Sequence, residues 1–287
     1  MPATTLKQSV KYTLVTPAIE RDFQYLDFNT DGLANAYNGL KNFFPSFLEK
    51  VRFSFASISQ IEPLATPDNA ERAFLVRNID SFEFSEVSSM AIQVPEGFDG
   101  KYNDYLPTIS GIVKEYHSFS SEVLKPLHGL LAVFLSNKDS RLNTASLEPV
   151  YTALRDRRQK HGEVLGENFI DSGKTSRKYI RDVFTSRGDI VTVIMQAEDL
   201  QQDIAQINLA SIKKEADTLL GLISIVEKRI EENTITELSP ETANNLALAI
   251  YEVGKQIEFL AALHYPCMVI ETCIDSVVTL LNKHIRE

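Results

Sequence analysis

A chain of 287 residues with 44% hydrophobic and 24% charged residues is long and apolar enough to fold around a core of its own, which excludes an extended disordered protein. The net charge of −10 disfavours non-specific binding to nucleic acid or anionic lipid. The length allows one large domain or two modest ones.

The two cysteines, Cys267 and Cys273, lie six residues apart. On a helix this spacing points the side chains to different sides, which disfavours both a disulfide bond and a shared metal ion. The first eleven residues lack the apolar core of a signal peptide, and the apolar stretch 127–135 is too short to cross a bilayer. We therefore expect an intracellular, cytoplasmic protein that does not enter a membrane.

Residues 1–145 are rich in aromatic side chains and prolines. They hold 19 of the 26 Phe and Tyr residues and eight of the eleven prolines, which indicates short helices separated by turns around an irregular core. The spacing of the apolar residues predicts helices at 18–28, 33–44 and 47–59.

The same region also shows β-type patterning. In residues 9–15 and 82–94, β-branched and aromatic side chains partly alternate with polar ones, which favours a small β element. A longer helical pattern then runs from Tyr102 to Phe134, and Pro126 is expected to kink or end a helix within it.

Residues 146–287 are predicted to form long helices. No proline occurs between Pro149 and Pro240, which leaves room for helices well above the average length. Six apolar residues recur at alternating spacings of four and three, so they form one stripe of a helix that must face another helix. They are Ile212, Ala216, Leu219, Ile223, Val226 and Ile230.

A second stripe follows a helix-start signal in which Ser239 precedes Pro240. The short connection predicts an antiparallel hairpin with the first stripe. Pro266 is expected to interrupt this helix, after which a third stripe resumes in a different register. The second stripe comprises Leu246, Ile250, Val253, Ile257, Leu260 and His264, and the third comprises Ile270, Ile274, Val277 and Leu281.

These patterns predict a mostly all-α protein with an aromatic-rich, irregular helical region at 1–145 and an antiparallel bundle of long helices at 146–287. The two regions form either separate domains or one interleaved domain. No repeat of fixed period occurs, which disfavours a solenoid.

Residues 172–175, Ser-Gly-Lys-Thr, resemble the end of a phosphate-binding loop. However, the first glycine of that motif would fall at Asn168, and a charged stretch rather than a buried strand precedes it. We prefer a loop in which Asp171 or Ser172 caps a helix that begins near Thr175.

The segment 155–187 carries nine Lys or Arg and five Asp or Glu residues, a net charge of +4, so the rest of the chain carries −14. Its basic side chains could form a face that binds phosphates or an acidic surface of a partner. The alternative is a solvated face balanced by acids elsewhere, which we favour because no nucleic-acid motif accompanies the charges. The candidates are Arg155, Arg157, Arg158, Lys160, Lys174, Arg177, Lys178 and Arg181.

The sequence shows no motif of a catalytic or metal site. The five histidines lack the spacings used by zinc proteases and by di-metal bundles, and no nucleophile motif occurs. His264 lies one turn before Cys267, a spacing that two metal ligands could use, but no second pair accompanies it. We therefore expect a buried histidine near a buried thiol, with neither a cofactor nor a metal.

The predicted function is that of a non-enzymatic structural or assembly subunit that docks protein partners or further copies of itself. A phage-like particle component is a special case, found in the host cytoplasm and the virion. The alternative is a nucleic-acid- or phosphate-binding accessory protein that uses the 155–187 segment, and the third is an enzyme of undetected type. The candidate packing residues are Ile212, Leu219, Ile223, Val226, Ile230, Leu246, Ile250, Val253, Ile257 and Leu260.

Overall fold

The computed structural model describes residues 49, 51–61, 68–96, 98, 100–136, 147–165, 175–232 and 240–287, without the side chains of 60, 162–165, 230 and 240–244. Helices account for 83% of the described residues and the strands form one two-stranded sheet, so the mostly all-α fold is confirmed. The helices predicted at 18–28 and 33–44 and the β-type stretch at 9–15 lie outside the described residues.

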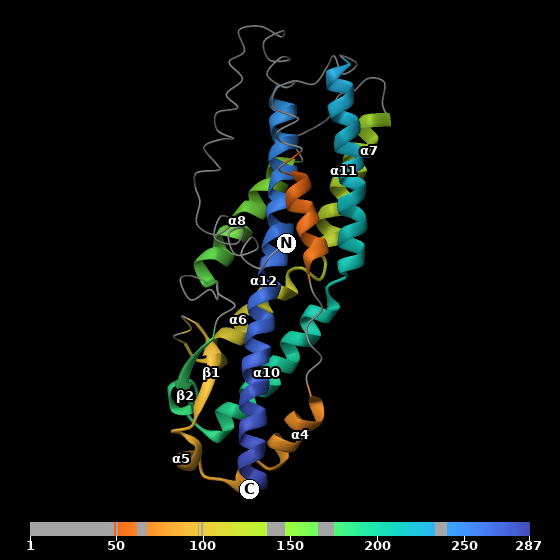
Figure 1. Cartoon of the computed structure of the whole chain (residues 1–287). Helices are drawn as coiled ribbons and strands as arrows, with labels where there is room; N and C mark the ends of the chain where they lie inside the picture. Colours follow the sequence, from red (N-terminus) through yellow and green to blue (C-terminus); the bar gives the residue numbers. More distant parts are fainter. Residues whose placement is uncertain are drawn as a thin grey trace.

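One long helix, α12 (Pro240–Arg286, 47 residues), is the axis of the described fold. At 1.5 Å per residue it is about 70 Å long. Figure 1 shows α12 running down the middle of an elongated molecule to the C-terminus. The helix α8 (Leu147–Leu165) packs beside its first half, and α4 (Asn69–Arg77) packs near its end.

Pro266 lies inside α12, so the interruption predicted at this residue is wrong. A proline removes one backbone donor and crowds the preceding turn, which costs roughly 3 kcal/mol in a helix interior. The side chains of Leu263, Cys267 and Ile270 are all buried on either side of it. Their packing offsets the local cost and keeps the two halves in one helix.

The elements before α8 are short, as the prolines and turn residues predicted. Residues 51–56 form a helix that continues into η1, with Val51, Phe55 and Ile58 buried on one face. Pro126 lies in the first turn of α7, directly after the π-helical turn η3, so the helix does not end at this proline. In chain order the elements are η1 (Ser57–Gln60), α4, η2 (Ile79–Ser81), α5 (Phe84–Val87), β1 (Ala91–Pro95), α6 (Tyr102–Lys114), η3 (Ser120–Leu124) and α7 (Lys125–Ser136).

The sheet pairs β1 with a strand from the second half of the chain, β2 (Thr175–Tyr179), in antiparallel register. The helix predicted to begin near Thr175 is therefore wrong, because α9 begins only at Ile180. No β2 side chain is buried, so the strand carries no apolar signal of its own and depends on pairing with β1. The β element predicted at 82–94 is correct only from Ala91 onward.

In the described residues, three helices lie between β2 and α12. They are α9 (Ile180–Val183), α10 (Arg187–Gln206) and α11 (Leu209–Glu231). The helices α10 and α6 pack closely against each other, and α11 packs on α7 and η3. Figure 1 shows α11 and α12 running in opposite directions, as predicted for an antiparallel hairpin, but α11 packs mainly on α7 and η3 rather than on α12.

The side chains of both predicted stripes are buried. On α11, Ile212, Leu219, Ile223 and Val226 are at most 1% exposed, and on α12, Leu246, Ile250, Val253, Ile257 and Leu260 are at most 3% exposed. The side chain of Ile230 is outside the described set. Because α11 packs mainly on α7 while α12 packs mainly on α8, the two stripes have different partners.

Residues 51–61 contact both α11 and α12. Arg52 Nη2 donates to Ser224 Oγ on α11 at 3.2 Å. Ser54 Oγ donates to Glu258 Oε1 on α12 at 2.7 Å. A segment from the first half of the chain therefore links the two long helices of the second half.

The buried apolar side chains of the described residues form one cluster that runs from Val51 to Leu281. It includes contacts across residue 145, such as the stacked rings of Tyr116 and Phe259, whose centroids lie 6.4 Å apart. The division into regions 1–145 and 146–287 stays a prediction.

Among the described helices, α12 has the length and composition of a membrane-crossing helix, over residues 245–286. A candidate of this length was not expected from the sequence, in which the apolar stretch singled out was 127–135. However, 78% of its apolar window is buried inside the fold, which is typical of a core helix, so this is weak support for a membrane span. The location of the protein stays a prediction.

Candidate functional site

A buried ion-pair network of the described residues lies where α4 meets the second half of α12. The side chain of Asp68 caps α4, because its Oδ1 accepts hydrogen bonds from the N–H groups of Ala70 and Glu71 at 3.1 Å each. This cap fixes the first turn of α4. The next residue, Arg72, points into the protein and is fully buried.

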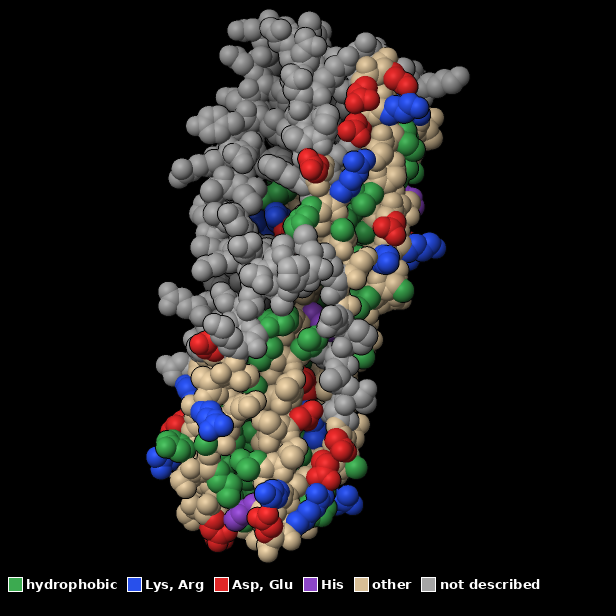
Figure 2. Space-filling model, viewed as in Figure 1, with side chains coloured by type: hydrophobic (Ala, Val, Ile, Leu, Met, Phe, Trp, Pro, Cys, Tyr) green, Lys and Arg blue, Asp and Glu red, His purple; other side chains and the backbone are tan. Residues whose placement is uncertain are grey.

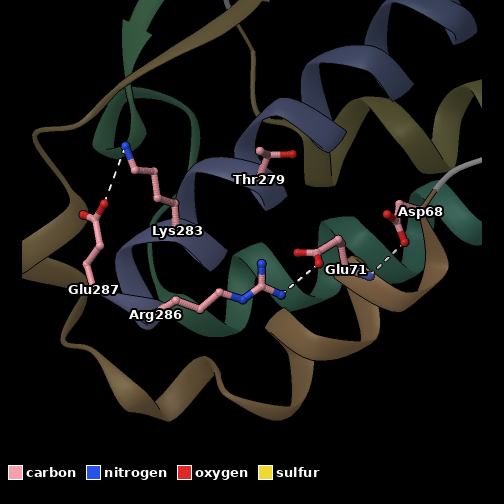
Figure 3. Close-up of a pocket in the computed structure, with 6 residues that line it drawn as sticks. All are labelled: Asp68, Glu71, Thr279, Lys283, Arg286 and Glu287. Carbon is pink, nitrogen blue, oxygen red and sulfur yellow. Dashed lines mark hydrogen bonds and ion pairs between the residues drawn. The ribbon is translucent and has the colours of Figure 1, made fainter.

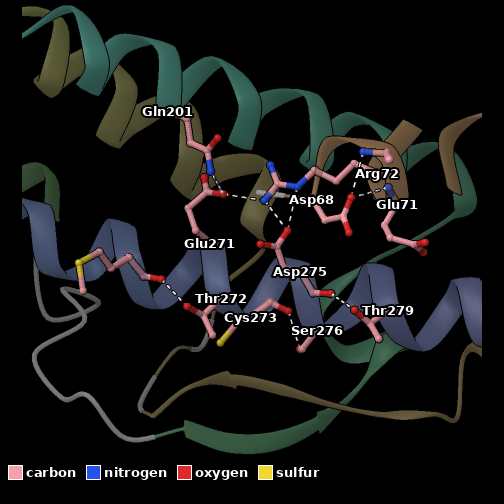
Figure 4. A network of polar contacts seen from close by, with 12 residues as sticks. Asp68, Glu71, Arg72, Gln201, Glu271, Thr272, Cys273, Asp275, Ser276 and Thr279 are labelled. Atoms are coloured by element: carbon pink, nitrogen blue, oxygen red, sulfur yellow. Dashed lines mark hydrogen bonds and ion pairs between the residues drawn. The ribbon is translucent and has the colours of Figure 1, made fainter. Parts of the chain in front are cut away.

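Arg72 binds two carboxylates that lie one turn apart on α12 (Figure 4). Its Nη2 donates to Glu271 Oε2 at 2.7 Å and to Asp275 Oδ1 at 2.6 Å. Its Nε donates to the same Asp275 oxygen at 2.8 Å. Glu271 is 3% exposed and Asp275 is 37% exposed, so the network runs from the interior towards the surface.

The helix α10 also takes part in this network. Gln201 Nε2 donates to Glu271 Oε2 at 2.8 Å, so one carboxylate oxygen accepts from two helices. Among the described residues, neither Glu271 Oε1 nor Arg72 Nη1 has a hydrogen-bond partner. The network therefore joins α4, α10 and α12 with part of its hydrogen-bonding capacity unused.

Burial shapes the protonation of this network. It raises the pKa of Glu271 to about 7, although the hydrogen bond and charge of Arg72 act in the opposite direction. For Arg72, burial alone would lower the pKa, but the hydrogen bonds and charges of Glu271 and Asp275 raise it above its ordinary value. The guanidinium stays charged, and Glu271 is the group that titrates near neutral pH.

A second set of polar contacts joins the same two helices nearer the surface, with Asn282 buried and Arg286 half exposed. Arg286 Nη2 donates to Glu71 Oε1 at 2.8 Å, and Asn282 Nδ2 donates to Glu71 Oε2 at 2.6 Å. The hydrogen bond from Arg286, followed by that from Asn282, lowers the pKa of Glu71. The Arg286 guanidinium also lies 4.5 Å from the ring centroid of Phe74.

These surface contacts border an open pocket of about 560 Å³ (Figure 3). Its two cations have partners, since Arg286 binds Glu71 and Lys283 Nζ lies 3.5 Å from Glu287 Oε1. With three carboxylates and two paired cations, the lining lacks the excess positive charge that an anion site needs. The lining residues are Asp68, Glu71, Thr279, Lys283, Arg286 and Glu287.

The basic residues predicted to form one face occupy three elements. On α8, Arg158 pairs with Glu252 of α12 and Arg157 pairs with Glu115, each at 3.3 Å. Arg155 lies 3.9 Å from the neighbouring Asp156, and Lys160 is exposed. Arg177 and Lys178 belong to β2 and Arg181 belongs to α9, whereas Lys174 lies outside the described residues.

The predicted pair of His264 and Cys267 is buried, at 8% and 0% exposure. The Cys267 thiol donates to the carbonyl oxygen of Leu263 at 3.2 Å, and burial raises its pKa. Among the described residues, no group of three or more His, Cys, Asp or Glu side chains is arranged to hold a metal ion.

The sequence patterns did not point to Arg72, Gln201, Glu271 or Asp275. One signal was present, because Glu271 lies between the buried stripe residues Ile270 and Ile274, where a charge requires a partner. The identity of that partner was not readable, since Arg72 precedes Glu271 by 199 residues.

Comparisons with protein-family models, with curated protein sequences and with solved structures gave no match to this chain.

Proposed function

We propose that this protein is a non-enzymatic structural or assembly subunit, a rigid helical rod that docks further copies of itself or other proteins. The observation that carries the proposal is the way α12 is fastened. Polar side chains along this helix bind α8, residues 51–61, α10 and α4 in turn.

In the first half of α12, Glu252 pairs with Arg158 of α8, and Gln256 Nε2 donates to the carbonyl oxygen of Leu154, also on α8, at 2.8 Å. Glu258 then accepts from Ser54. These contacts all lie in the interior of the fold. They fix the rotation and the height of each element relative to α12.

Further along, Glu271 accepts from Arg72 of α4 and Gln201 of α10. Buried ion pairs add little net stability compared with apolar packing, but they penalise wrong registers strongly, because a misplaced partner leaves a buried charge unpaired. A rod with a fixed register presents its outer surface in one geometry, which is what an assembly subunit requires.

The first surface to test lies where residues 51–61 meet α11. Phe53 and Ile225 are each 45% exposed, and each directly follows a residue of the hydrogen bond between Arg52 and Ser224. Figure 2 shows hydrophobic side chains among charged ones on this upper part of the molecule. These exposed apolar side chains at the junction of two elements make it the first surface to probe for a protein contact.

The test uses two copies of the full chain with different affinity tags, produced together in the native source. We expect the second copy, or a stoichiometric protein partner, to co-purify with the first. Ile225→Asp is expected to reduce this recovery, whereas Met195→Asp, which alters an exposed residue of α10, is the matched control. Recovery of the tagged chain alone, without copy or partner, would overturn the proposal.

Under the same proposal the protein works inside the cell, or in the host cytoplasm and virion if it belongs to a phage-like particle. The ion pairs of Arg157 and Arg158 within the fold support a structural role for these residues over phosphate binding. We therefore do not expect Arg157 and Arg158 to mediate salt-dependent binding of DNA or RNA. A variant with both Arg157→Ala and Arg158→Ala is not expected to abolish such binding.

A further inference from the structure

The two-stranded sheet has an edge formed by β2. The N–H group of Ile180 donates to the carbonyl oxygen of Met90 at 3.0 Å. In antiparallel pairing, alternate residues turn their N–H and C=O groups to the same neighbour. Ser176 and Lys178 therefore point these groups towards β1, and Thr175, Arg177 and Tyr179 point theirs away from it.

The outward backbone groups of β2 are largely unused among the described residues. Asp182 Oδ2 accepts from the N–H group of Tyr179 at 3.0 Å, which closes one end of the edge. The described part of the chain provides no backbone hydrogen bond to the outward groups of Thr175 and Arg177. Such an edge is a template for another strand.

The side chains along this edge are mostly basic. Arg177 and Arg181 are exposed, and Asp182, whose carboxylate binds the N–H group of Tyr179, is the one acidic residue from Thr175 to Asp182. Tyr179 is 47% exposed, and the Arg181 guanidinium lies 4.9 Å from its ring centroid. Figure 2 shows Lys and Arg side chains at the left edge of the molecule, where β2 lies in Figure 1.

This charge selects between occupants of the edge. A second copy of β2 would bring its own Arg177 and Lys178 beside those of the first, and like charges on neighbouring strands are destabilising. A strand with acidic side chains would instead form opposite-charge pairs with Arg177 and Arg181. The chemistry of the edge therefore fits an acidic partner.

We propose that the outer edge of β2 is a docking site for an extended acidic segment of a partner protein, which pairs with it as a third strand. The proposal rests on the proposed function, because it names one class of partner for an assembly subunit. The backbone groups of Thr175 and Arg177 supply the hydrogen bonds. Arg177 and Arg181 supply the preference for acidic side chains.

The probe is a fluorescein-labelled peptide of eight residues that alternates Glu and Val, titrated with the full chain and followed by fluorescence polarisation. We expect binding at low salt. A peptide that alternates Lys and Val carries the opposite charge and tests whether binding requires acidic side chains. A Glu-Val peptide N-methylated at every second residue tests the backbone pairing and is expected to bind roughly tenfold more weakly.

Two variants of one residue separate charge from backbone. Arg177→Ala keeps the outward N–H group and is expected to weaken binding about two- to fivefold. Arg177→Pro also removes that N–H group while the hydrogen bonds to β1 remain. It is expected to weaken peptide binding roughly two- to tenfold further than Arg177→Ala does. Arg155→Ala removes the same charge from α8 and is expected to leave binding unchanged. Circular dichroism checks that each variant is folded.

Absence of measurable binding at low salt would overturn the proposal, and so would equal affinity for the N-methylated peptide, which would indicate charge attraction without strand pairing. The co-purification of tagged copies gives an independent result. If no copy or partner co-purifies but the peptide still binds, the assembly proposal is rejected and the strand site is kept. If a copy or partner co-purifies but the peptide does not bind, the strand site alone is rejected.

Discussion

Two sets of ion pairs join α4 to the end of α12, and they differ in burial rather than in length. Arg72 binds Glu271 at 2.7 Å with exposures of 0% and 3%, whereas Arg286 binds Glu71 at 2.8 Å with exposures of 51% and 33%. Exposed pairs contribute little because water and salt screen them. Removal of one partner from a buried pair leaves an uncompensated charge. We therefore expect the inner pair to control the junction and the outer pair to matter little.

The sharpest test of this comparison is Arg72→Met. Methionine keeps much of the volume of the arginine stem but leaves Glu271 without its cation in the interior. We expect a loss of unfolding free energy of about 3–5 kcal/mol, measured by urea denaturation at pH 8. A loss below about 1 kcal/mol at that pH would show that the network does not hold α4 to α12.

The pH dependence of stability sharpens the same point. The pKa of Glu271 is about 7 in the folded protein and has an ordinary value of 4.5, so between these values the folded state binds more protons than the unfolded state. The contribution of this group is therefore fully present below pH 4.5 and is lost as the pH rises through 7, with a slope of up to about 1.4 kcal/mol per pH unit.

Glu271→Gln removes this titration. We expect the difference in unfolding free energy between the natural protein and the variant to change with pH between about 5 and 8, and the cost of Arg72→Met to shrink towards pH 5. Urea midpoints over this range provide the measurement. A difference that stays constant with pH would mean that Glu271 does not titrate in this window.

The helical pattern of the molecule was readable from the sequence because it depends on local spacing. The stripe residues Leu219 and Ile257 are fully buried, as their periodicity predicted. The partners of the stripes were not readable, since periodicity shows which face is buried and not against what. The placement of residues 51–61 between α11 and α12 is a long-range choice made by packing.

The buried network and β2 were beyond sequence reasoning for two different reasons. Arg72 and Glu271 are ordinary charged residues until the fold brings them together. The strand from Thr175 to Tyr179 is polar throughout, and only its pairing with β1 distinguishes it from a loop or a helix start. Pro266 shows a third reason, because buried packing outweighed a strong local signal.

A pair of glycine substitutions extends the comparison of buried and open positions. A Cβ atom at Gly254 would lie 3.1 Å from Ser54 Cβ, whereas at Gly221 it would meet nothing within 4 Å. Gly221→Ala is expected to stabilise the protein by about 0.5–1 kcal/mol through helix propensity. For Gly254→Ala we expect no such stabilisation, because the close contact of the new Cβ atom with Ser54 offsets the gain in helix propensity. Thermal unfolding of both variants decides, and equal stabilisation would contradict the close contact.

The smallest expected effect is that of Arg286→Met in the outer pair. We expect its urea midpoint to stay close to that of the natural protein, and the small difference to fade as salt is added, because Arg286 is half exposed. A loss as large as that of Arg72→Met would remove the distinction between the two sets of pairs.

The central claim is that this rigid helical rod works as a subunit of an assembly. The most direct measurement is the molar mass of the protein gently isolated from its native source, by size-exclusion chromatography with light scattering. We predict a defined complex with a mass well above the 32.3 kDa of one chain. A single species of 32.3 kDa at all accessible concentrations would contradict the claim.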